Sequence, residues 1–196
     1  MTQEEKEKKF DLESKMDEML IQKRIIILSA PVDDDSAYSI VRRFLYLETL
    51  NSKKPILFIV NSPGGSIHSG FVMWDHMQQI KAPVFTLATG LAASMGSILI
   101  LAAKQGNRFA THHARIMIHQ PLINRSVYGQ ATDLEIQAKE IIKTRELLID
   151  LYREKTGKDR PSIEKALDRD TWMSATEAKA FNLVDHIISS YEEIGF

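Results

Sequence analysis

The sequence contains no cysteine among its 196 residues. This absence excludes disulfide bonds, zinc sites built on thiolates and a cysteine nucleophile, and it fits a reducing compartment. An excess of basic residues is also missing, because 25 Lys and Arg stand against 26 Asp and Glu, a net charge of −1. Proteins that bind nucleic acid without sequence preference need a basic face, so we expect no nucleic-acid partner.

Long apolar runs are missing as well. The longest apolar stretch, residues 97–103, is far too short to span a bilayer. The segment Met1–Lys9 is charged, with no apolar run after a basic start, so it does not resemble a signal peptide. We therefore expect a cytoplasmic protein without a membrane partner. The composition, 44% hydrophobic and 26% charged, is typical of one globular domain.

Strand-like and helix-like apolar patterns alternate along the chain. This alternation predicts an α/β fold with mostly parallel strands and right-handed crossovers. Residues before Phe10 are expected to be disordered. The predicted strands span residues 24–28, 56–60, 83–89, 115–119 and 183–188, and the predicted helices span 11–22, 36–50, 67–80, from 93 onward, about 132–155, and 174–180.

Two of these helices carry a capping box, in which Ser or Thr is followed three residues later by Glu. Thr132 and Glu135 predict the start of the long helix, and Gly157 predicts its end. Ser174 and Glu177 predict the start of a short helix that runs to Ala180.

Ser94 lies where a buried strand turns into a buried helix, within the segment Gly90–Ser97 of mostly small residues. A helix start offers unpaired backbone N–H groups and the positive end of a dipole, which suits a developing anion. These are the properties of a nucleophile elbow, although the sequence does not match the motif Gly-x-Ser-x-Gly. A structural interpretation is also open, since serine is a good N-cap and small residues permit close helix packing.

Partners for a catalytic serine occur later in the chain. His119 ends a predicted strand, and strand carboxyl ends are where open α/β sheets place ligand chemistry, although one histidine near a core strand can be a coincidence. Asp168 and Asp170 precede Trp172, which we expect to be buried, so a carboxylate there can orient a histidine. A charged turn is more often a solvated surface, and we keep that interpretation for Asp168.

Gly64-Gly65 follows a predicted central strand and supplies the backbone freedom and N–H groups that an anion cradle needs. It could equally be a tight turn. His112-His113 has no third ligand at a suitable spacing, so no metal site is expected. Each signal is weak alone, but the serine, histidine, aspartate and Gly-Gly turn are together the parts of a serine hydrolase.

Five motifs resemble, in series, those of the ClpP family, the proteolytic subunits of the Clp protease. The resemblance runs in register from about Arg24 to Ile188, and the motifs are highly specific as a set. They are Asn61–Ser66, Gly90–Gly96, Met117–Pro121, Gly129–Asp133 and Asp168–Ala175.

The resemblance implies a crotonase-like spiral of ββα units in a single α/β domain. That domain spans residues 24–196 and includes a long handle helix at about 131–156, where two rings meet. Residues 1–23 are then an N-terminal segment of the axial region, partly disordered and with a short helix.

The same resemblance assigns site residues. It implies that Ser94 is the nucleophile, His119 the general base and Asp170 the orienting acid. The backbone N–H groups of Gly65 and Met95 would form the oxyanion hole. Asp168 and Arg169 match an acid–base pair that in the family links ring contacts to the geometry of the triad.

The implied activity is that of an ATP-dependent serine endopeptidase that hydrolyses unfolded proteins to short peptides. Family members assemble heptameric rings into a tetradecamer, whose chamber is fed by a AAA+ unfoldase. No cofactor is expected, because peptide hydrolysis needs none and ATP belongs to the unfoldase.

Some positions depart from the family pattern. Residues 122–128 lack two glycines that usually follow His-Gln-Pro, so cleavage preference and inter-ring register are open. Asn182 stands in place of a helix-ending glycine, and asparagine tolerates the left-handed conformation. Several of the positions that match the unfoldase docking pocket are small or polar where the family usually has aromatic or apolar walls, and we expect weak docking and a paralogous partner ring. The matching positions are Leu57, Ile59, Gln79, Thr89 and Thr111.

Two alternatives to an autonomous peptidase stay open. The chain could be a catalytically latent ring subunit whose triad is aligned only by a paralogous ring. It could also be a crotonase-type acyl-CoA enzyme, because that family shares the fold and a backbone oxyanion hole. Crotonases do not need Ser, His and Asp together, however, and no basic patch suggests the phosphates of CoA.

Overall fold

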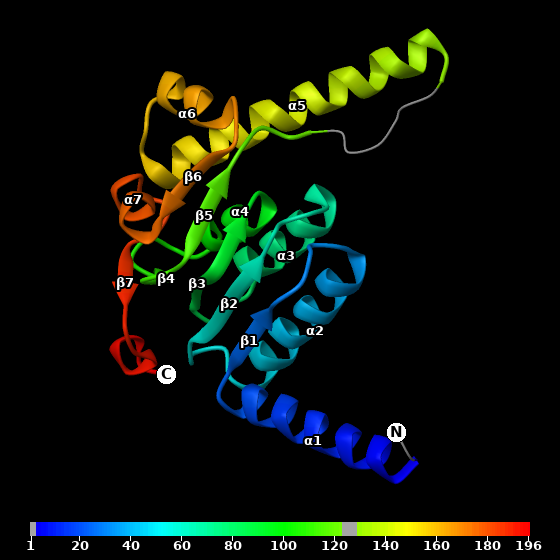
Figure 1. Cartoon of the computed structure of the whole chain (residues 1–196), viewed down its shortest axis with the longest axis vertical. Coiled ribbons are helices and arrows are strands. Elements are labelled where there is room, and N and C mark those ends of the chain that lie inside the picture. Colours follow the sequence, from blue (N-terminus) through cyan, green and yellow to red (C-terminus); the bar gives the residue numbers. More distant parts are fainter. Residues whose placement is uncertain (1–2, 123–128) are drawn as a thin grey trace.

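The computed structural model describes residues 3–122 and 129–196, and within them a seven-stranded sheet is flanked by helices (Figure 1). No helix in these two ranges is both long and apolar enough to cross a membrane. The strands are β1 (Ile25–Leu28), β2 (Ile56–Ser62), β3 (Val84–Ala93), β4 (Arg108–Thr111), β5 (Arg115–Ile118), β6 (Thr171–Ser174) and β7 (His186–Ile188). The helices are α1 (Gln3–Gln22), α2 (Asp34–Leu50), α3 (Ile67–Gln79), α4 (Met95–Leu101), α5 (Ala131–Thr156), α6 (Arg160–Leu167) and α7 (Ala175–Ala180), followed by a 3₁₀ turn, η1 (Tyr191–Ile194).

The sheet is parallel except at one pair, as the alternation of elements predicts. Its main path runs β1-β2-β3-β4-β7, while β5 pairs with β3 and β6 pairs antiparallel with β5. Strand β3 is longer than expected and has two neighbours on one side. Its first part pairs with β4 at Thr86–Ala88, and its last part pairs with β5 at Leu91–Ala93. This branch brings the carboxyl ends of β3 and β5 together.

The two faces of the sheet are covered unequally. Successive residues of β2 belong to different apolar clusters, because strand side chains alternate between faces. Phe58 packs in the large cluster that includes residues of α2, α3, α4 and α5, whereas Leu57 packs in a smaller one with Phe109 and Ile194. Helices therefore cover one face, and the C-terminal turn η1 contributes to the cover of the other.

Helix α5 contacts the body only near its C-terminal end. Its buried residues are Leu148, Ile149, Tyr152 and Thr156, and the rest of the helix extends away from the sheet (Figure 1). Gly157 ends the helix in the left-handed conformation, as predicted. The predicted capping box at Thr132 is wrong, because the N-cap is Gln130 and makes no side-chain cap bond.

Other local predictions are confirmed or corrected. Ser174 and Glu177 form the predicted capping box, and Asn182 has a φ of +67°. Helix α1 begins at Gln3, earlier than the expected start near Asp11, because Glu, Lys and Gln are strong helix formers. Trp172 is 48% exposed rather than buried, because β6 is an edge strand.

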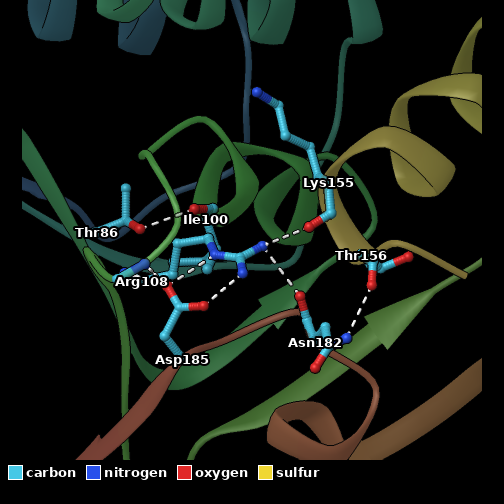
Figure 2. Close-up of polar contacts among 8 residues, drawn as sticks. Thr86, Ile100, Arg108, Lys155, Thr156, Asn182 and Asp185 are labelled. Atoms are coloured by element: carbon cyan, nitrogen blue, oxygen red, sulfur yellow. Dashed lines mark hydrogen bonds and ion pairs between the residues drawn. The ribbon is translucent and has the colours of Figure 1, made fainter.

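A buried ion pair joins β4 to the ends of two helices (Figure 2). The Arg108 side chain is 2% exposed; its Nε donates to Asp185 at 2.9 Å, and its Nη1 donates to the carbonyls of Lys155 and Asn182 at 3.0 Å each. Burial of Asp185 acts to raise the pKa of its carboxyl, but the hydrogen bonds and charge of Arg108 outweigh it and hold that pKa below its usual value. The pair thus fastens the base of α5 to the sheet. The charge of Arg108 also explains why no strand was predicted at β4.

Candidate active site

Ser94 follows the last residue of β3 and precedes α4, in a backbone conformation that non-glycine residues rarely adopt. Its φ is +53° and its ψ is −121°. Such a conformation costs about 1–3 kcal/mol and persists only where the surroundings enforce it. Here the Ser94 N–H donates to the Met117 carbonyl of β5 at 2.9 Å. Ser94 is the N-cap residue of α4 by position, but its side chain makes no cap bond, so the hydroxyl is not used to cap the helix.

The register of three strands brings Ser94, His119 and Asp170 together. Ala93 of β3 pairs with Met117 of β5, so the next residues at both strand ends are neighbours. Ile118 of β5 pairs antiparallel with Thr171 of β6, which sets His119 opposite Asp170. The side chains meet accordingly.

The hydrogen bonds form a continuous chain from serine to carboxylate. The distance from Ser94 Oγ to His119 Nε2 is 2.8 Å, and the distance from His119 Nδ1 to Asp170 Oδ1 is 3.2 Å. With a proton on Nδ1, His119 donates to Asp170 and its Nε2 accepts from the Ser94 hydroxyl. This is the arrangement in which a histidine removes a proton from a serine.

The Gly64-Gly65 turn lies directly against the Ser94 elbow. A Cβ atom at Gly64 would lie 2.7 Å from Ser94 Cβ and 2.8 Å from the Met95 backbone nitrogen, closer than real atoms approach. At Gly65 a Cβ atom would lie 2.2 Å from the Val32 carbonyl oxygen. Both glycines have positive φ, of +86° and +150°. Glycine is required here by contact and by backbone conformation.

The residue after the serine is positioned from α3, a contribution that sequence reasoning missed. Met95 is 1% exposed, and a Cβ atom at Gly70 would lie 2.2 Å from its Cγ. Gly70 therefore leaves the space that the Met95 side chain fills. A glycine within the predicted helix 67–80 was the available signal, because glycine weakens a helix unless something packs against it.

Asp168 and Arg169 lie beside the triad but point to solvent. Their side chains are 71% and 92% exposed, and Arg169 Nε lies 3.9 Å from Asp168 Oδ2. The Gln120 side chain donates to the Asp168 carbonyl at 3.0 Å, which ties the loop after His119 to the end of α6. Asp170 is the carboxylate that reaches the histidine, and Asp168 is not.

The part of the chain that the structure describes has no cluster of three or more His, Asp or Glu side chains that could hold a metal ion. The segment that departs from the family after His-Gln-Pro falls mostly on residues 123–128, which lie outside the described residues.

Comparison with known proteins agrees with the geometry. The sequence model of the family described as Clp protease matches residues 6–191. A protein of Protochlamydia amoebophila named ATP-dependent Clp protease proteolytic subunit 1 is 56% identical over 180 residues, 92% of this chain and 87% of the relative. The protein of the same name from Chlamydia trachomatis serovar D is 51% identical over 183 residues, 93% of this chain and 95% of the relative. A Bdellovibrio bacteriovorus protein named ATP-dependent Clp protease proteolytic subunit is 44% identical over 185 residues, 94% of this chain and 85% of the relative.

Proposed function

Because the chain belongs to the Clp protease family and is a Clp-type serine peptidase, we propose that Ser94, His119 and Asp170 are its catalytic triad. The observation that carries this proposal is the bonded chain from Ser94 Oγ to His119 at 2.8 Å and from His119 to Asp170 at 3.2 Å. The family membership sets aside the acyl-CoA alternative, and the mixed α/β domain is consistent with a ClpP/crotonase-like fold.

The proposed reaction begins when Ser94 Oγ attacks the carbonyl carbon of a peptide bond while His119 Nε2 takes the hydroxyl proton. The negative charge on the carbonyl oxygen is held by the backbone N–H groups of Gly65 and Met95. The protonated His119 then gives its proton to the leaving amine, the C–N bond breaks, and an acyl-serine remains. Water, deprotonated by His119, attacks this ester, and release of the carboxylate restores Ser94.

The proposed assembly is a ring of subunits whose stacked pairs enclose a chamber, fed with unfolded protein by a AAA+ ATPase. The extended part of α5 supports it, since four large apolar side chains there are 40–58% exposed in a single subunit: Leu134, Ile136, Ile142 and Leu147. Large apolar side chains left exposed along a helix are typical of an interface between subunits. Asp168 and Arg169 are proposed to make contacts between rings. Their exposure next to Asp170 supports that role.

A second candidate is a latent ring subunit that needs a paralogous ring. Two relatives are named subunit 1, and the number itself supports the existence of another subunit in those organisms. The Asp170 side chain is 59% exposed, so a partner ring can reach the carboxylate that contacts His119, which supports this candidate.

We also propose that the protein is located in the cytoplasm.

The test is to label the purified full-length protein with a fluorophosphonate and to map the adduct by mass spectrometry, with Ser94→Ala as the control. Labelling confined to Ser94 supports an autonomous peptidase subunit. A folded sample that stays unlabelled until a paralogous ring is added supports the latent subunit. Labelling at another serine would show that the proposed nucleophile is wrong.

A further inference from the structure

Two buried hydroxyl groups lie beside the elbow and take no part in the proposed reaction. Ser97 in α4 and Tyr152 in α5 are each 1% exposed, and their side-chain oxygens lie 2.8 Å apart. Ser97 Oγ also donates to the Ser94 carbonyl oxygen at 2.7 Å. A chain of hydrogen bonds therefore runs from the base of α5 to the backbone of the nucleophile.

The direction of this chain follows from proton counting. A serine hydroxyl has one hydrogen, and a carbonyl oxygen can only accept. Because Ser97 donates its hydrogen to Ser94, Tyr152 must be the donor in the bond between the two hydroxyls. Burial raises the pKa of the Tyr152 phenol, so the phenol keeps its proton and stays a donor. The order of donation is Tyr152 to Ser97 to the Ser94 carbonyl.

The Ser94 carbonyl shares one planar peptide unit with the Met95 N–H. In a trans peptide the C=O and N–H bonds point in opposite directions, so a contact that orients one orients the other. The described part of the chain contains no cis peptide bond. Hydrogen bonds accepted by a carbonyl also polarise the peptide and strengthen its N–H as a donor.

We propose that Ser97 and Tyr152 are positioning residues that aim the Met95 N–H at the oxyanion through the Ser94–Met95 peptide. This inference rests on the proposed function, because it needs Met95 in the oxyanion hole. The role differs from packing alone, since it predicts a loss of rate that does not follow the loss of stability.

Four variants of the full-length protein separate the two roles. Ser97→Ala removes the side-chain donor to the Ser94 carbonyl, which keeps the backbone N–H groups of Ser97 at 3.0 Å and Ile98 at 3.4 Å, and it leaves the Tyr152 hydroxyl without its partner. The double variant S97A/Y152F removes both hydroxyls and leaves no unpaired donor, so it recovers stability relative to Ser97→Ala. Tyr152→Phe leaves Ser97 in place without its anchor. Thr86→Val is the matched control, because Thr86 is fully buried and its Oγ1 donates to the Ile100 carbonyl of the same helix α4 at 2.8 Å, away from the elbow (Figure 2).

The measurements are the second-order rate of Ser94 labelling by a fluorophosphonate, kcat and KM on a fluorogenic peptide, and the thermal unfolding midpoint. We expect Ser97→Ala and the double variant to label about tenfold more slowly, less than the roughly 10²–10³-fold loss on deleting an oxyanion donor. Tyr152→Phe slows labelling by about threefold, because the donor remains but is less well oriented. The loss falls in kcat and leaves KM within about twofold, since the contact acts on the transition state. Thr86→Val lowers the midpoint without slowing labelling.

Recovery of the wild-type labelling rate by the double variant, along with its stability, would show that the pair is structural only and would overturn the inference. Equal slowing by Thr86→Val would overturn it too, because any lost bond in α4 would then have the same effect. A wild-type protein that does not label at Ser94 either alone or with a paralogous ring contradicts the proposed function, and the inference falls with it. Labelled wild type with unaffected variants contradicts the inference alone.

Discussion

Ser94 and Asp170 lie at opposite ends of one hydrogen-bonded chain, but the protein holds them in different ways. Ser94 has its N–H bonded to Met117, its carbonyl bonded to Ser97 and its Cβ against Gly64. The Asp170 side chain is 59% exposed and meets His119 at 3.2 Å. Electrostatic interactions are strong where water is excluded and are screened where it is not. The position of the proposed nucleophile is therefore fixed by contacts within the subunit, and the proposed orienting carboxylate is open to influence from neighbouring subunits.

The same contrast separates two acid–base pairs of the chain. Arg108 and Asp185 form a pair whose side chains are 2% and 12% exposed, with further bonds to helix ends. Asp168 and Arg169 are 71% and 92% exposed and lie 3.9 Å apart. We expect the first pair to stabilise the subunit and the second to contribute little to it, which leaves the second free to serve contacts between rings.

The largest effect is expected from breaking the exposed end of the triad. Asp170→Asn should lower kcat on the order of 10⁴-fold, because the amide favours the wrong tautomer of His119. Peptide hydrolysis by assembled particles measures the loss. Asp168→Asn, two residues away, should leave the labelling rate of Ser94 unchanged and alter the distribution of oligomers instead. Equal loss of labelling in both variants would contradict the separation of the two aspartates.

The next effect tests the buried ion pair. Arg108→Met should lower the free energy of unfolding by about 3–5 kcal/mol, because Asp185 is left as a partly buried charge without its partner. Arg169→Met, the matched change in the exposed pair, should shift it by less than about 1 kcal/mol. Denaturant unfolding of both variants gives the comparison. Similar losses of unfolding free energy in Arg108→Met and Arg169→Met would mean that burial does not make the first ion pair more stabilising than the second.

A smaller but more local effect is expected at the Gly-Gly turn. Gly64→Ala should reduce kcat by about a hundredfold, because the added methyl displaces the Ser94–Met95 peptide and its oxyanion donor. Gly106→Ala is the control, since Gly106 has a similar φ of +93° with nothing within 4 Å of its added Cβ. Both variants bear backbone strain, but only Gly64→Ala should lose activity beyond its loss of folded protein. A comparable loss in Gly106→Ala would assign the effect to strain.

The smallest expected effect is on the stability of the folded protein at low pH. Since Arg108 holds the folded-state pKa of Asp185 below its unfolded value, this pair contributes its stability fully above the unfolded pKa of about 3.9 and loses it as pH falls through the folded pKa. The stability advantage of wild type over Asp185→Asn should therefore shrink between about pH 5 and pH 2. Thermal unfolding midpoints at the two pH values measure it. If the stability advantage of wild type over Asp185→Asn grew as the pH fell, the pKa of Asp185 would be raised by folding and not lowered.

Several features were predictable because their signals are local. Strand-length apolar runs placed β1, β2, β3 and β5, and a serine among small residues at a strand end indicated the elbow. The residues alone left Asp168 and Asp170 unresolved, and resemblance to a family chose between them. The antiparallel register of β5 and β6 gives the physical reason, since it sets Asp170 opposite His119. Register depends on pairing across more than fifty residues of chain, which no local pattern encodes.

The sequence by itself predicted the fold class and singled out Ser94 and His119 as candidate site residues, because strand ends, small residues and glycines act within a few positions of one another. Only the tertiary structure decided that Arg108 is buried against two helix ends and that Tyr152 reaches Ser97 from 55 residues away. From sequence alone, a charged residue such as Arg108 is expected to be exposed, and a helical tyrosine such as Tyr152 is expected to be an ordinary core residue. The strength of the hydrogen bonds that these two side chains make depends on burial and on donor geometry, and both are properties of the folded chain.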